Sequence, residues 1–472
     1  MTFEQCMADA AQRHRVSLGN GVEPFARLAY DAELPIKQDA VAKFCASLKV
    51  SASIVDPIVP ATMPRGYRTT SRRRVRVRPG SVELVHGDGS TADGASPLEP
   101  ELHSLIYVYL TDAIKRLTPP LRQALNHVIL RGSYEELVLI VNVSELDARV
   151  VRSLRTLAEN VRDTFPQVQH AWLYHDPKGS RYYLDLERPA TGVGAKKLYG
   201  ASAWKQIVGG VQYQVGVFSF SQVNLSMVER LVQVVREHAA CTTDDTLYDV
   251  YCGYGLFGAA LASEVQRVIA IDGDEATVDN ARYTIRRAGG TCTALAQVIR
   301  SGDDVDAIVR TLYRIARKDP SESSNVIVLD PPRSGTAERV IAELGSGLQP
   351  RRVVEVYCGP DEIYRSTREW RQAGYGVTRI TPVDLFPGTT SMEFVVTYDR
   401  GAVTAAPPSE PRQYTRSTPR SGPQSAPRSG PRSGPNGGSR GGPKGGSRSG
   451  PRNEQRGGSR STPKNGGRSR RP

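Results

Sequence analysis

The sequence predicts an α/β fold for its larger part: a Rossmann-like, doubly wound sheet with antiparallel strands at its C-terminal edge. From residue 246 to residue 400, short apolar runs that suit strands alternate with amphipathic stretches that suit helices. Repeated units of this kind are typical of a parallel sheet with helices on both faces. The last two apolar runs, Gly376 to Val383 and Met392 to Tyr398, are joined by a short loop and therefore fit an antiparallel pair.

We divide the chain of 472 residues where its composition and periodicity change. Residues 1–60 are expected to be mainly helical, because apolar residues recur at spacings of three and four after Tyr30. Residues 61–215 mix helical and strand patterns, which predicts an α+β central domain. Residues 216–400 are the α/β domain, and residues 401–472 are a tail rich in Gly, Pro, Ser and Arg.

The composition argues against several classes of protein. No apolar run has membrane-spanning length, and the N-terminus lacks the pattern of a secretory signal. The six cysteines are scattered without a CxxC pair, and the seven histidines show no metal-ligand spacing. These features disfavour a zinc site or a disulfide framework and favour a reducing compartment. We therefore expect a cytoplasmic protein with no metal site and no membrane partner.

The net charge of +13 is concentrated in the tail. Fifteen of the 62 lysines and arginines, but only two of the 49 acids, lie in residues 401–472, so the rest of the chain carries 47 of each. With almost no apolar residues, the tail cannot offset its own ordering entropy and is predicted to be disordered. Such a tail is suited to bind RNA nonspecifically through charge and guanidinium stacking. The alternative is that it only keeps the protein soluble.

A second basic feature lies near the start of the central domain. Arg74-Val-Arg-Val-Arg78 alternates with period two, which predicts a strand with one face lined by guanidinium groups. A row of guanidinium groups fits a phosphate backbone. The alternative is a solvated strand face paired with acids. The central domain is thus a candidate RNA-binding domain.

A glycine-rich turn marks a candidate cofactor site. Gly253 and Gly255 follow the first strand of the α/β domain and open its first helix, so a ligand can approach the backbone there. Asp272 ends the next strand, where an acid can accept hydrogen bonds from both ribose hydroxyls of an adenosine. Gly258 would complete a GxGxxG pattern, which keeps a nicotinamide dinucleotide as a rival cofactor.

Two features favour S-adenosylmethionine over a dinucleotide. Asp249 stands four residues before Gly253, giving the acid-x-x-x-Gly-x-Gly signature of class I methyltransferases. Asp330-Pro-Pro-Arg333 ends the fourth strand, where such enzymes bring the methyl donor and the target together. The alternative for Asp-Pro-Pro is a simple helix-initiating turn, because proline favours the first helical position.

Cys358 is a candidate nucleophile. It follows the apolar run Val353 to Tyr357 and precedes a Gly-Pro turn, where side chains project into the cleft of an open α/β sheet. Taken alone, a cysteine at a strand end is more often a small buried hydrophobe. Cys252, within the glycine turn, is the rival nucleophile.

Five short motifs in this order resemble those of the RNA (uracil-5-)-methyltransferase family, class I enzymes that form 5-methyluridine. They are Phe220-Ser-Gln-Val-Asn224, Asp249-Val-Tyr-Cys-Gly-Tyr-Gly-Leu-Phe257, Asp330-Pro-Pro-Arg-Ser-Gly335, Tyr357-Cys-Gly-Pro360 and Asp384-Leu-Phe-Pro-Gly-Thr-Thr-Ser-Met-Glu393. Tyr30 to Val41 and Pro64 to Arg68 are similar to landmarks of the family's central domain, so the resemblance spans about residues 25–400.

The chain departs from the family pattern at four places. Tyr357 and Gly359 replace the usual Ser and Asn beside the cysteine, and Ser391 replaces a His. The place before Tyr30 lacks the Cys-Gly-Gly-Cys run that binds an iron–sulfur cluster in some members, so no cluster is expected. No β-barrel RNA-binding domain is evident at the N-terminus, and the basic tail is a candidate substitute.

The resemblance implies roles for individual residues. Cys358 would be the nucleophile and Glu393 the proton acceptor. Arg333 would contact the base or a phosphate. Seven residues would hold S-adenosylmethionine: Gln222, Tyr251, Gly253, Gly255, Leu256, Asp272 and Asp330.

The implied reaction is methylation of carbon 5 of a uridine in transfer or ribosomal RNA. A thiolate that adds to carbon 6 turns the poorly nucleophilic carbon 5 into an enolate carbon that can attack the methyl group. We expect a monomer that acts on RNA. Two alternatives stay open: a non-catalytic RNA-binding or remodelling factor on a methyltransferase scaffold, and an RNA cytosine-5 methyltransferase.

Overall fold

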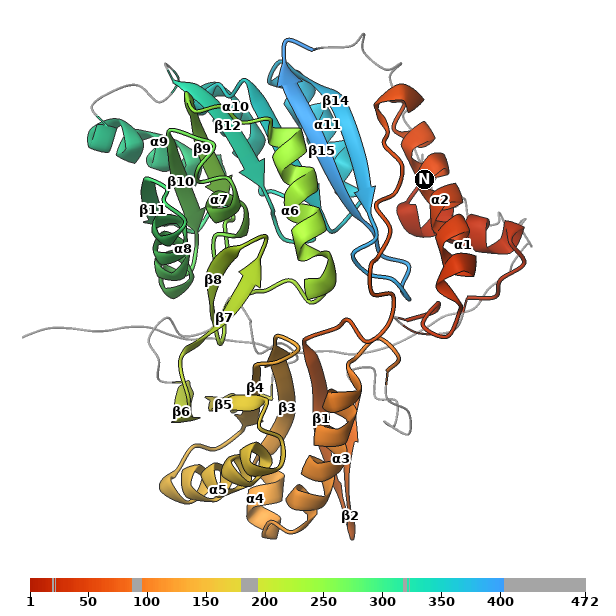
Figure 1. The fold of residues 1–472 in the computed structure, drawn as a ribbon, viewed down its shortest axis with the longest axis vertical. Coiled ribbons are helices and arrows are strands. Elements are labelled where there is room, and N and C mark those ends of the chain that lie inside the picture. The colour runs from red at the N-terminus through yellow and green to blue at the C-terminus, as the bar shows by residue number, and fades with distance from the viewer. Residues whose placement is uncertain are drawn as a thin grey trace, which may run out of the picture. The chain divides into compact units, whose positions relative to one another are not determined.

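Figure 1 shows a computed structural model of the chain, which describes residues 1–18, 21, 23–86, 96–179, 194–316, 321 and 323–402. These described residues belong to one compact unit. The tail that the sequence predicts to be disordered lies outside the described residues from position 403 onward. No described helix is both long enough and apolar enough to cross a membrane.

A seven-stranded sheet forms the core of the C-terminal half, coloured green to blue in Figure 1. Its strand order is β11-β10-β9-β12-β13-β15-β14, and the first five strands run parallel. β15, the last strand in the chain, lies between β13 and β14 and is antiparallel to both. β14 therefore forms this edge of the sheet. The strands are β9 (Asp245–Val250), β10 (Arg267–Asp272), β11 (Cys292–Ala296), β12 (Ser324–Leu329), β13 (Arg352–Tyr357), β14 (Tyr375–Val383) and β15 (Glu393–Arg400).

Helices cover both faces of this sheet, which confirms the predicted doubly wound fold. One face packs against α6 (Leu225–Ala239), α7 (Leu256–Ala260) and α8 (Glu275–Arg287). The other packs against α9 (Gly302–Ala316), α10 (Val340–Leu348) and α11 (Glu362–Gln372). All of β9 is buried, and so are β12 and β13 after their first residues, as expected for strands that are covered on both faces.

The N-terminal helices α1 (Phe3–Arg13) and α2 (Tyr30–Ser47) pack beside β14 and β15, as the red ribbons in Figure 1 show. The ring of Phe3 makes edge contacts with Phe44 and Phe394, at centroid distances of 5.4 and 5.6 Å. A short 3-10 helix, Ala52–Ile54, follows. The chain after it forms bridges from Val55 and Val59 to β14, which covers the exposed edge of the sheet.

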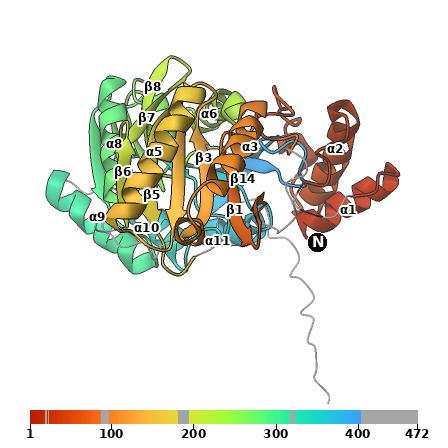
Figure 2. The same cartoon turned by 90° about the horizontal axis from the view of Figure 1, so that it is seen from below.

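A six-stranded sheet with helices on one face forms the α+β region that the sequence predicts. Its strand order is β2-β1-β3-β4-β5-β6, and α3 and α5 cover one face, as the view from below shows (Figure 2). The opposite face contributes Ile129, Val138 and Ile140 to the same core as α6. The elements are β1 (Ser71–Arg78), β2 (Ser81–Val85), α3 (Glu101–Lys115), α4 (Pro119–Gln123), β3 (Leu125–Gly132), β4 (Leu137–Val143), α5 (Ala148–Thr164), β5 (Val168–His175) and β6 (Ala195–Tyr199).

A two-stranded hairpin, β7 (Ala203–Val208) and β8 (Val211–Gly216), connects this region to α6. Trp204 and Tyr213 are fully buried in the core that α6, α7 and α8 share. The Tyr213 hydroxyl donates to the carbonyl of Leu256 at 3.0 Å. The hairpin therefore packs on the start of α7, next to the predicted cofactor turn.

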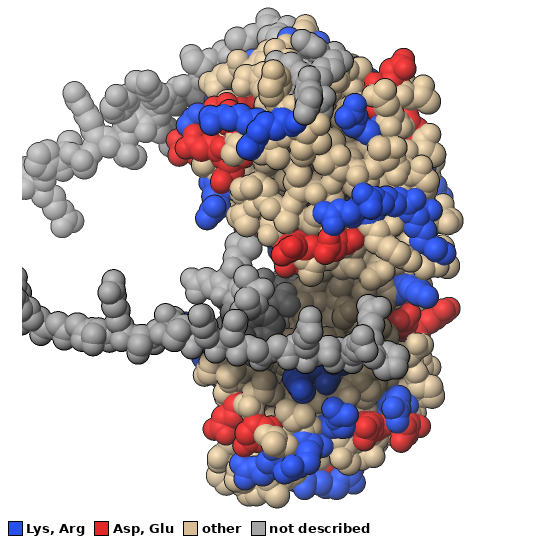
Figure 3. Space-filling view, turned by 90° about the vertical axis from the view of Figure 1, so that its left-hand side faces the viewer, with Lys and Arg blue, Asp and Glu red and all other residues tan. Residues whose placement is uncertain are grey.

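Buried and more exposed side chains alternate along most of the arginine-rich strand β1. The arginines on its two faces pair with different acids. Arg73 is buried against Glu99, at 2.6 Å. On the other face Arg76 and Arg78 lie 3.6 and 3.8 Å from Glu83, and Arg74 is exposed. Basic and acidic side chains are intermixed on the face drawn in Figure 3. Outside the tail, the chain thus carries charges of both signs close together, in keeping with its formal neutrality.

Candidate active site

The turn after β9 has the open backbone that the sequence predicts. Tyr251, Gly253 and Gly255 have φ of +62°, +52° and +82°. A positive φ is unusual for tyrosine and is characteristic of strained functional turns. The backbone N–H of Gly253 donates to Oδ2 of Asp272 at 2.9 Å. The ends of β9 and β10 are thereby joined, and Asp272 lies beside the turn.

The third glycine, Gly258, serves packing and not a ligand. Its N–H donates to Oδ2 of Asp249 at 2.7 Å. A Cβ at position 258 would lie 2.8 Å from the same oxygen, so a side chain would push the carboxylate away. The GxGxxG spacing that suggested a dinucleotide is therefore explained by the close approach of α7 to Asp249.

Three carboxyl groups around the turn are poised to meet positive charge. Burial raises the pKa of Asp249 to about 8 and that of Asp330 to about 7. Burial also raises the pKa of Asp272. Oδ1 of Asp249 is buried without a hydrogen-bond partner among the described residues. Because an adjacent cation would stabilise the ionised forms of these carboxyl groups, their presence around the turn fits a sulfonium cofactor.

The segment that contains Gln222 connects the cofactor turn to the other half of the site. Ser219 shares a hydrogen bond of 2.7 Å with Thr277, at the start of the helix after Asp272. Gln222 is 6% exposed, and the Asn224 amide donates to the carbonyl of Leu385 at 2.8 Å. Within the described residues, no hydrogen bond joins the Gln222 side chain to the turn itself.

Cys358, Glu393, Asp330 and Arg333 come together where β12, β13 and β15 meet. Burial and, to a smaller extent, the charges of Glu393 and Asp330 raise the pKa of Cys358 to about 12, and the charge of Arg333 opposes them. Burial raises the pKa of Glu393 to about 8, again with Asp330 adding to the shift and Arg333 opposing it. Oε2 of Glu393 has no hydrogen-bond partner among the described residues. The thiol is partly exposed, so a substrate can reach it.

The rival Cys252 lies in a different environment. Its thiol is 6% exposed and faces the carbonyl of Gly253 at 3.5 Å. Burial raises its pKa well above that of a free thiol, and the neighbouring charges are Asp249 and Asp272 rather than Glu393. Cys252 thus packs beneath the cofactor turn, apart from the predicted proton acceptor.

Two residues that depart from the family pattern have separate structural roles. Tyr357 is 2% exposed and points into the core, where its hydroxyl lies 2.8 Å from that of Tyr398. It therefore does not line the site. Gly359 does: a Cβ there would lie 2.5 Å from the backbone carbonyl oxygen of Arg333. The absence of a side chain lets the Asp330–Gly335 loop approach the Cys358 turn.

Leu256 begins α7 and is 4% exposed, so its side chain serves packing. Sequence reasoning missed a buried charged cluster beneath the loop that precedes Glu393, formed by Glu33, Lys37 and Asp384. Glu33 and Lys37 are four residues apart on one helix, a spacing that usually marks a surface ion pair. The only available signal was that both fall in the segment similar to a family landmark.

The fold and the cofactor turn define a class I S-adenosylmethionine-dependent methyltransferase. Residues 208–400 match the model of the family described as tRNA (Uracil-5-)-methyltransferase. The resemblance to the RNA (uracil-5-)-methyltransferase family that the five motifs indicate is thereby confirmed for this region, and the protein is an RNA methyltransferase.

Relatives and a solved structure agree with this conclusion. An uncharacterized RNA methyltransferase of Streptococcus mutans is 26% identical over 400 residues, covering 80% of this chain and 82% of the relative. One of Lactiplantibacillus plantarum is 25% identical over 401 residues, covering 82% and 83%. The Pyrococcus abyssi tRNA (uracil-54, C5)-methyltransferase, solved with S-adenosyl-L-homocysteine, aligns with a TM-score of 0.56 at 19% identity, over 80% of this chain and 84% of that chain. At this identity the last match shows the fold alone.

Proposed function

We propose that the protein methylates carbon 5 of a uridine in RNA through a covalent bond between Cys358 and carbon 6, with Glu393 as the proton acceptor. The observation that carries the proposal is the placement of a partly exposed thiol beside a buried carboxyl group at adjacent strand ends. S-adenosylmethionine supplies an electrophilic methyl group. It would be held by Gln222, Tyr251, Gly253, Gly255, Leu256, Asp272 and Asp330.

The chemistry assigned to the chain's own residues has two halves. The Cys358 sulfur adds to carbon 6 and the electron pair moves toward the carbonyl at carbon 4, so carbon 5 becomes nucleophilic. After carbon 5 has gained the methyl group, the Glu393 carboxylate removes its remaining proton. The carbon 5–carbon 6 double bond re-forms, the bond from sulfur to carbon 6 breaks, and the thiolate is released.

The environment of the two groups suits this order of events. The high pKa of Cys358 makes its thiolate a strong nucleophile, but the thiol must first give up its proton to water, and Arg333 is the nearby cation that favours the ionised form. Arg333 is also proposed to contact the base or a phosphate. A pKa of about 8 leaves Glu393 basic enough to accept a proton near neutral pH. A uridine within folded RNA must leave its stack to reach these groups, at a cost of a few kcal/mol.

The test compares the two cysteines. We expect Cys358→Ala to abolish both methyl transfer and the trapping of RNA that contains 5-fluorouracil. Cys252→Ala should retain both, because that thiol lies away from Glu393. The reverse pattern would assign the nucleophile to Cys252. If the unsubstituted protein binds RNA but neither methylates nor traps it, the non-catalytic alternative holds.

Transfer RNA is the substrate that we propose first. The matched family model and the Pyrococcus abyssi structure both name transfer RNA. Mass spectrometry of 5-methyluridine in transfer and ribosomal RNA, with and without the gene, tests this choice. Loss of the modification from ribosomal RNA alone would redirect it.

The tail is proposed as a nonspecific RNA tether. Its fifteen bases and two acids give it the charge excess of the whole chain. Truncation after Arg400 should weaken RNA binding and reduce the slope of log affinity against log salt, because fewer counterions are released. An unchanged slope would leave the tail as a solubilising segment.

A further inference from the structure

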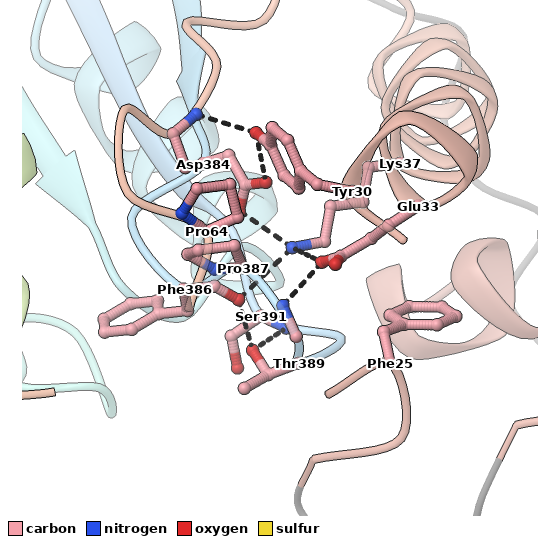
Figure 4. Close-up of polar contacts among 12 residues, drawn as sticks. Phe25, Tyr30, Glu33, Lys37, Pro64, Asp384, Phe386, Pro387, Thr389 and Ser391 are labelled. Atoms are coloured by element: carbon pink, nitrogen blue, oxygen red, sulfur yellow. Dashed lines mark hydrogen bonds and ion pairs between the residues drawn. The ribbon is translucent and has the colours of Figure 1, made fainter. Parts of the chain in front are cut away.

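A buried charged cluster joins the first turns of α2 to the loop that leads to Glu393. Glu33, Lys37 and Asp384 are each 0% exposed. The Lys37 ammonium lies 2.9 Å from Glu33 and 2.7 Å from Asp384, and it donates to the carbonyl of Phe386 at 3.2 Å. Figure 4 shows the ammonium at the centre of these contacts. All three donor positions of the ammonium are therefore used.

Two further side chains complete the cluster. The Tyr30 hydroxyl donates to Oδ2 of Asp384 at 3.0 Å and accepts from the backbone N–H of Ala61 at 2.7 Å. Arg65 lies 3.0 Å from Oε2 of Glu33. The cluster thus contains two cations and two carboxylates. Its charge is balanced, and removal of one partner would leave a buried charge uncompensated.

The cluster forms hydrogen bonds to the backbone of the loop between β14 and β15. The N–H of Gly388 donates to Oε1 of Glu33 at 2.6 Å, and its carbonyl accepts from Phe25 at 3.0 Å. The carbonyl of Pro387 accepts from the Tyr67 hydroxyl at 2.9 Å. Glu393 is the first residue of β15, directly after this loop. The loop that the cluster holds therefore runs directly into the strand that begins with Glu393.

We propose that Glu33 and Lys37 are positioning residues that fix the Glu393 carboxylate against the proton on carbon 5 of the target uridine. The inference rests on the proposed function, because it assigns the cluster to the second half of that reaction. Glu33 and Lys37 do not touch the substrate. They act through Gly388, Phe386 and Asp384, which connect α2 to the proton acceptor.

The position of the step gives the proposal a specific signature. Glu393 acts after the bond to Cys358 has formed and after the methyl group has moved. A displaced carboxylate therefore slows release of the enzyme more than it slows formation of the adduct. The protein–RNA adduct should accumulate on ordinary uridine-containing RNA, which a general loss of stability cannot produce.

The experiment compares Glu33→Gln with Asp245→Asn in the full chain, using unmodified transfer RNA transcripts and S-adenosylmethionine. Asp245 is also 0% exposed and bonded to an arginine, Arg351 at 2.7 Å, but it begins β9, at the opposite end of the strands from the site. It therefore controls for the loss of a buried charge. Steady-state methylation, the fraction of denaturation-stable adduct and Tm are measured for each variant.

We expect Glu33→Gln to lower turnover by about 10- to 100-fold, the loss typical of a misplacement approaching 1 Å. The adduct fraction should rise severalfold, whereas Asp245→Asn should lower Tm without raising the adduct fraction. Should Glu33→Gln fail to fold, Tyr30→Phe removes the hydrogen bonds to Asp384 and from Ala61 while leaving the ion pairs in place, and should show the same signature more weakly. An adduct fraction that stays at the level of the unsubstituted protein in the folded variants overturns the proposal.

Failure of the proposed function is distinguishable from failure of this inference. Trapping of 5-fluorouracil RNA by the unsubstituted protein does not depend on proton removal from carbon 5. Absence of trapping overturns the covalent mechanism itself. Trapping by the unsubstituted protein, without accumulation in the α2 variants, overturns only the positioning role.

Discussion

Gly359→Ala is the substitution that tests the geometry around Cys358 most directly. The added Cβ would lie 2.5 Å from the carbonyl oxygen of Arg333, whereas ordinary contact begins at 3.4 Å. The two turns must separate by about 0.9 Å, the difference between these distances. The obstacle is backbone and not a flexible side chain, so the shift displaces the Asp330–Gly335 loop or the Cys358 turn.

The expected cost follows from that displacement. Overpacking of a tight contact destabilises by about 1–3 kcal/mol. A misplacement of about 1 Å between reacting groups can reduce a rate by about 100-fold. We therefore expect a modest loss of Tm together with a large loss in the single-turnover rate of methyl transfer. The rate should fall far more than the stability alone would require.

The control adds the same methyl group where there is room. A Cβ at Gly194 would lie 3.6 Å from the carbonyl of His175, an ordinary contact, and Gly194 does not have a positive φ. Gly194→Ala should leave both the rate and Tm close to their original values. A Gly359→Ala enzyme with an unchanged single-turnover rate would refute the reasoning, because the loop would then have moved without consequence for the reacting groups.

Two further predictions concern protonation. The pKa values of Asp330 and Glu393 are raised to about 7 and about 8 in the folded chain, whereas the unfolded chain releases these protons near pH 4. The two protonated carboxyl groups therefore contribute stability to the fold that is complete below pH 4 and is lost as pH rises through 7 to 8. We expect Tm of the ligand-free protein to fall from about pH 7.5 to about pH 8.5, because above about pH 7.5 the buried histidines, whose pKa values are lowered in the folded chain, are almost entirely neutral in the unfolded chain as well. A flat or rising Tm would contradict this. Glu393→Gln should remove a negative charge that raises the pKa of Cys358, so alkylation of this cysteine by iodoacetamide at pH 8 should become faster while turnover is lost. Peptide mapping by mass spectrometry measures the rate at Cys358, with partly exposed Cys292 as the internal reference, and slower alkylation of Cys358 would argue against close contact of the two groups.

The parts of the site that the sequence predicts well are those that local structure determines. The glycine turn, Asp272 and Asp330 each follow an apolar strand, and parallel strands bring their carboxyl ends to one edge. The alternation of side chains along a strand also decides which way Tyr357 points. The sequence shows that Tyr357 and Cys358 point to opposite faces of the sheet, but it does not show which face α11 covers. That face is known only from the packing of the whole sheet.

Two features could not be predicted because distant backbone contacts produce them. Gly359 is a departure from a motif in the sequence, but its reason is the carbonyl of Arg333, which belongs to a different loop. The predicted antiparallel pair is present, but the sequence does not say which of its strands joins the parallel sheet, and the structure places β15 between β13 and β14. Strand insertion depends on pairing energy across the sheet and not on any short segment.

The contact between α2 and the loop before Glu393 has a consequence for the synthesis of the protein. Lys37 and Asp384 are 347 positions apart, so this contact must close a very long loop of chain. During translation, Glu33 and Lys37 leave the ribosome long before Asp384 is made, and until then they can form a hydrated ion pair on a helix surface. Their burial becomes possible only after β14 has been made. A growing chain with a complete cofactor turn therefore still lacks the support for its proton acceptor, and competence for turnover is among the last properties that the new protein acquires.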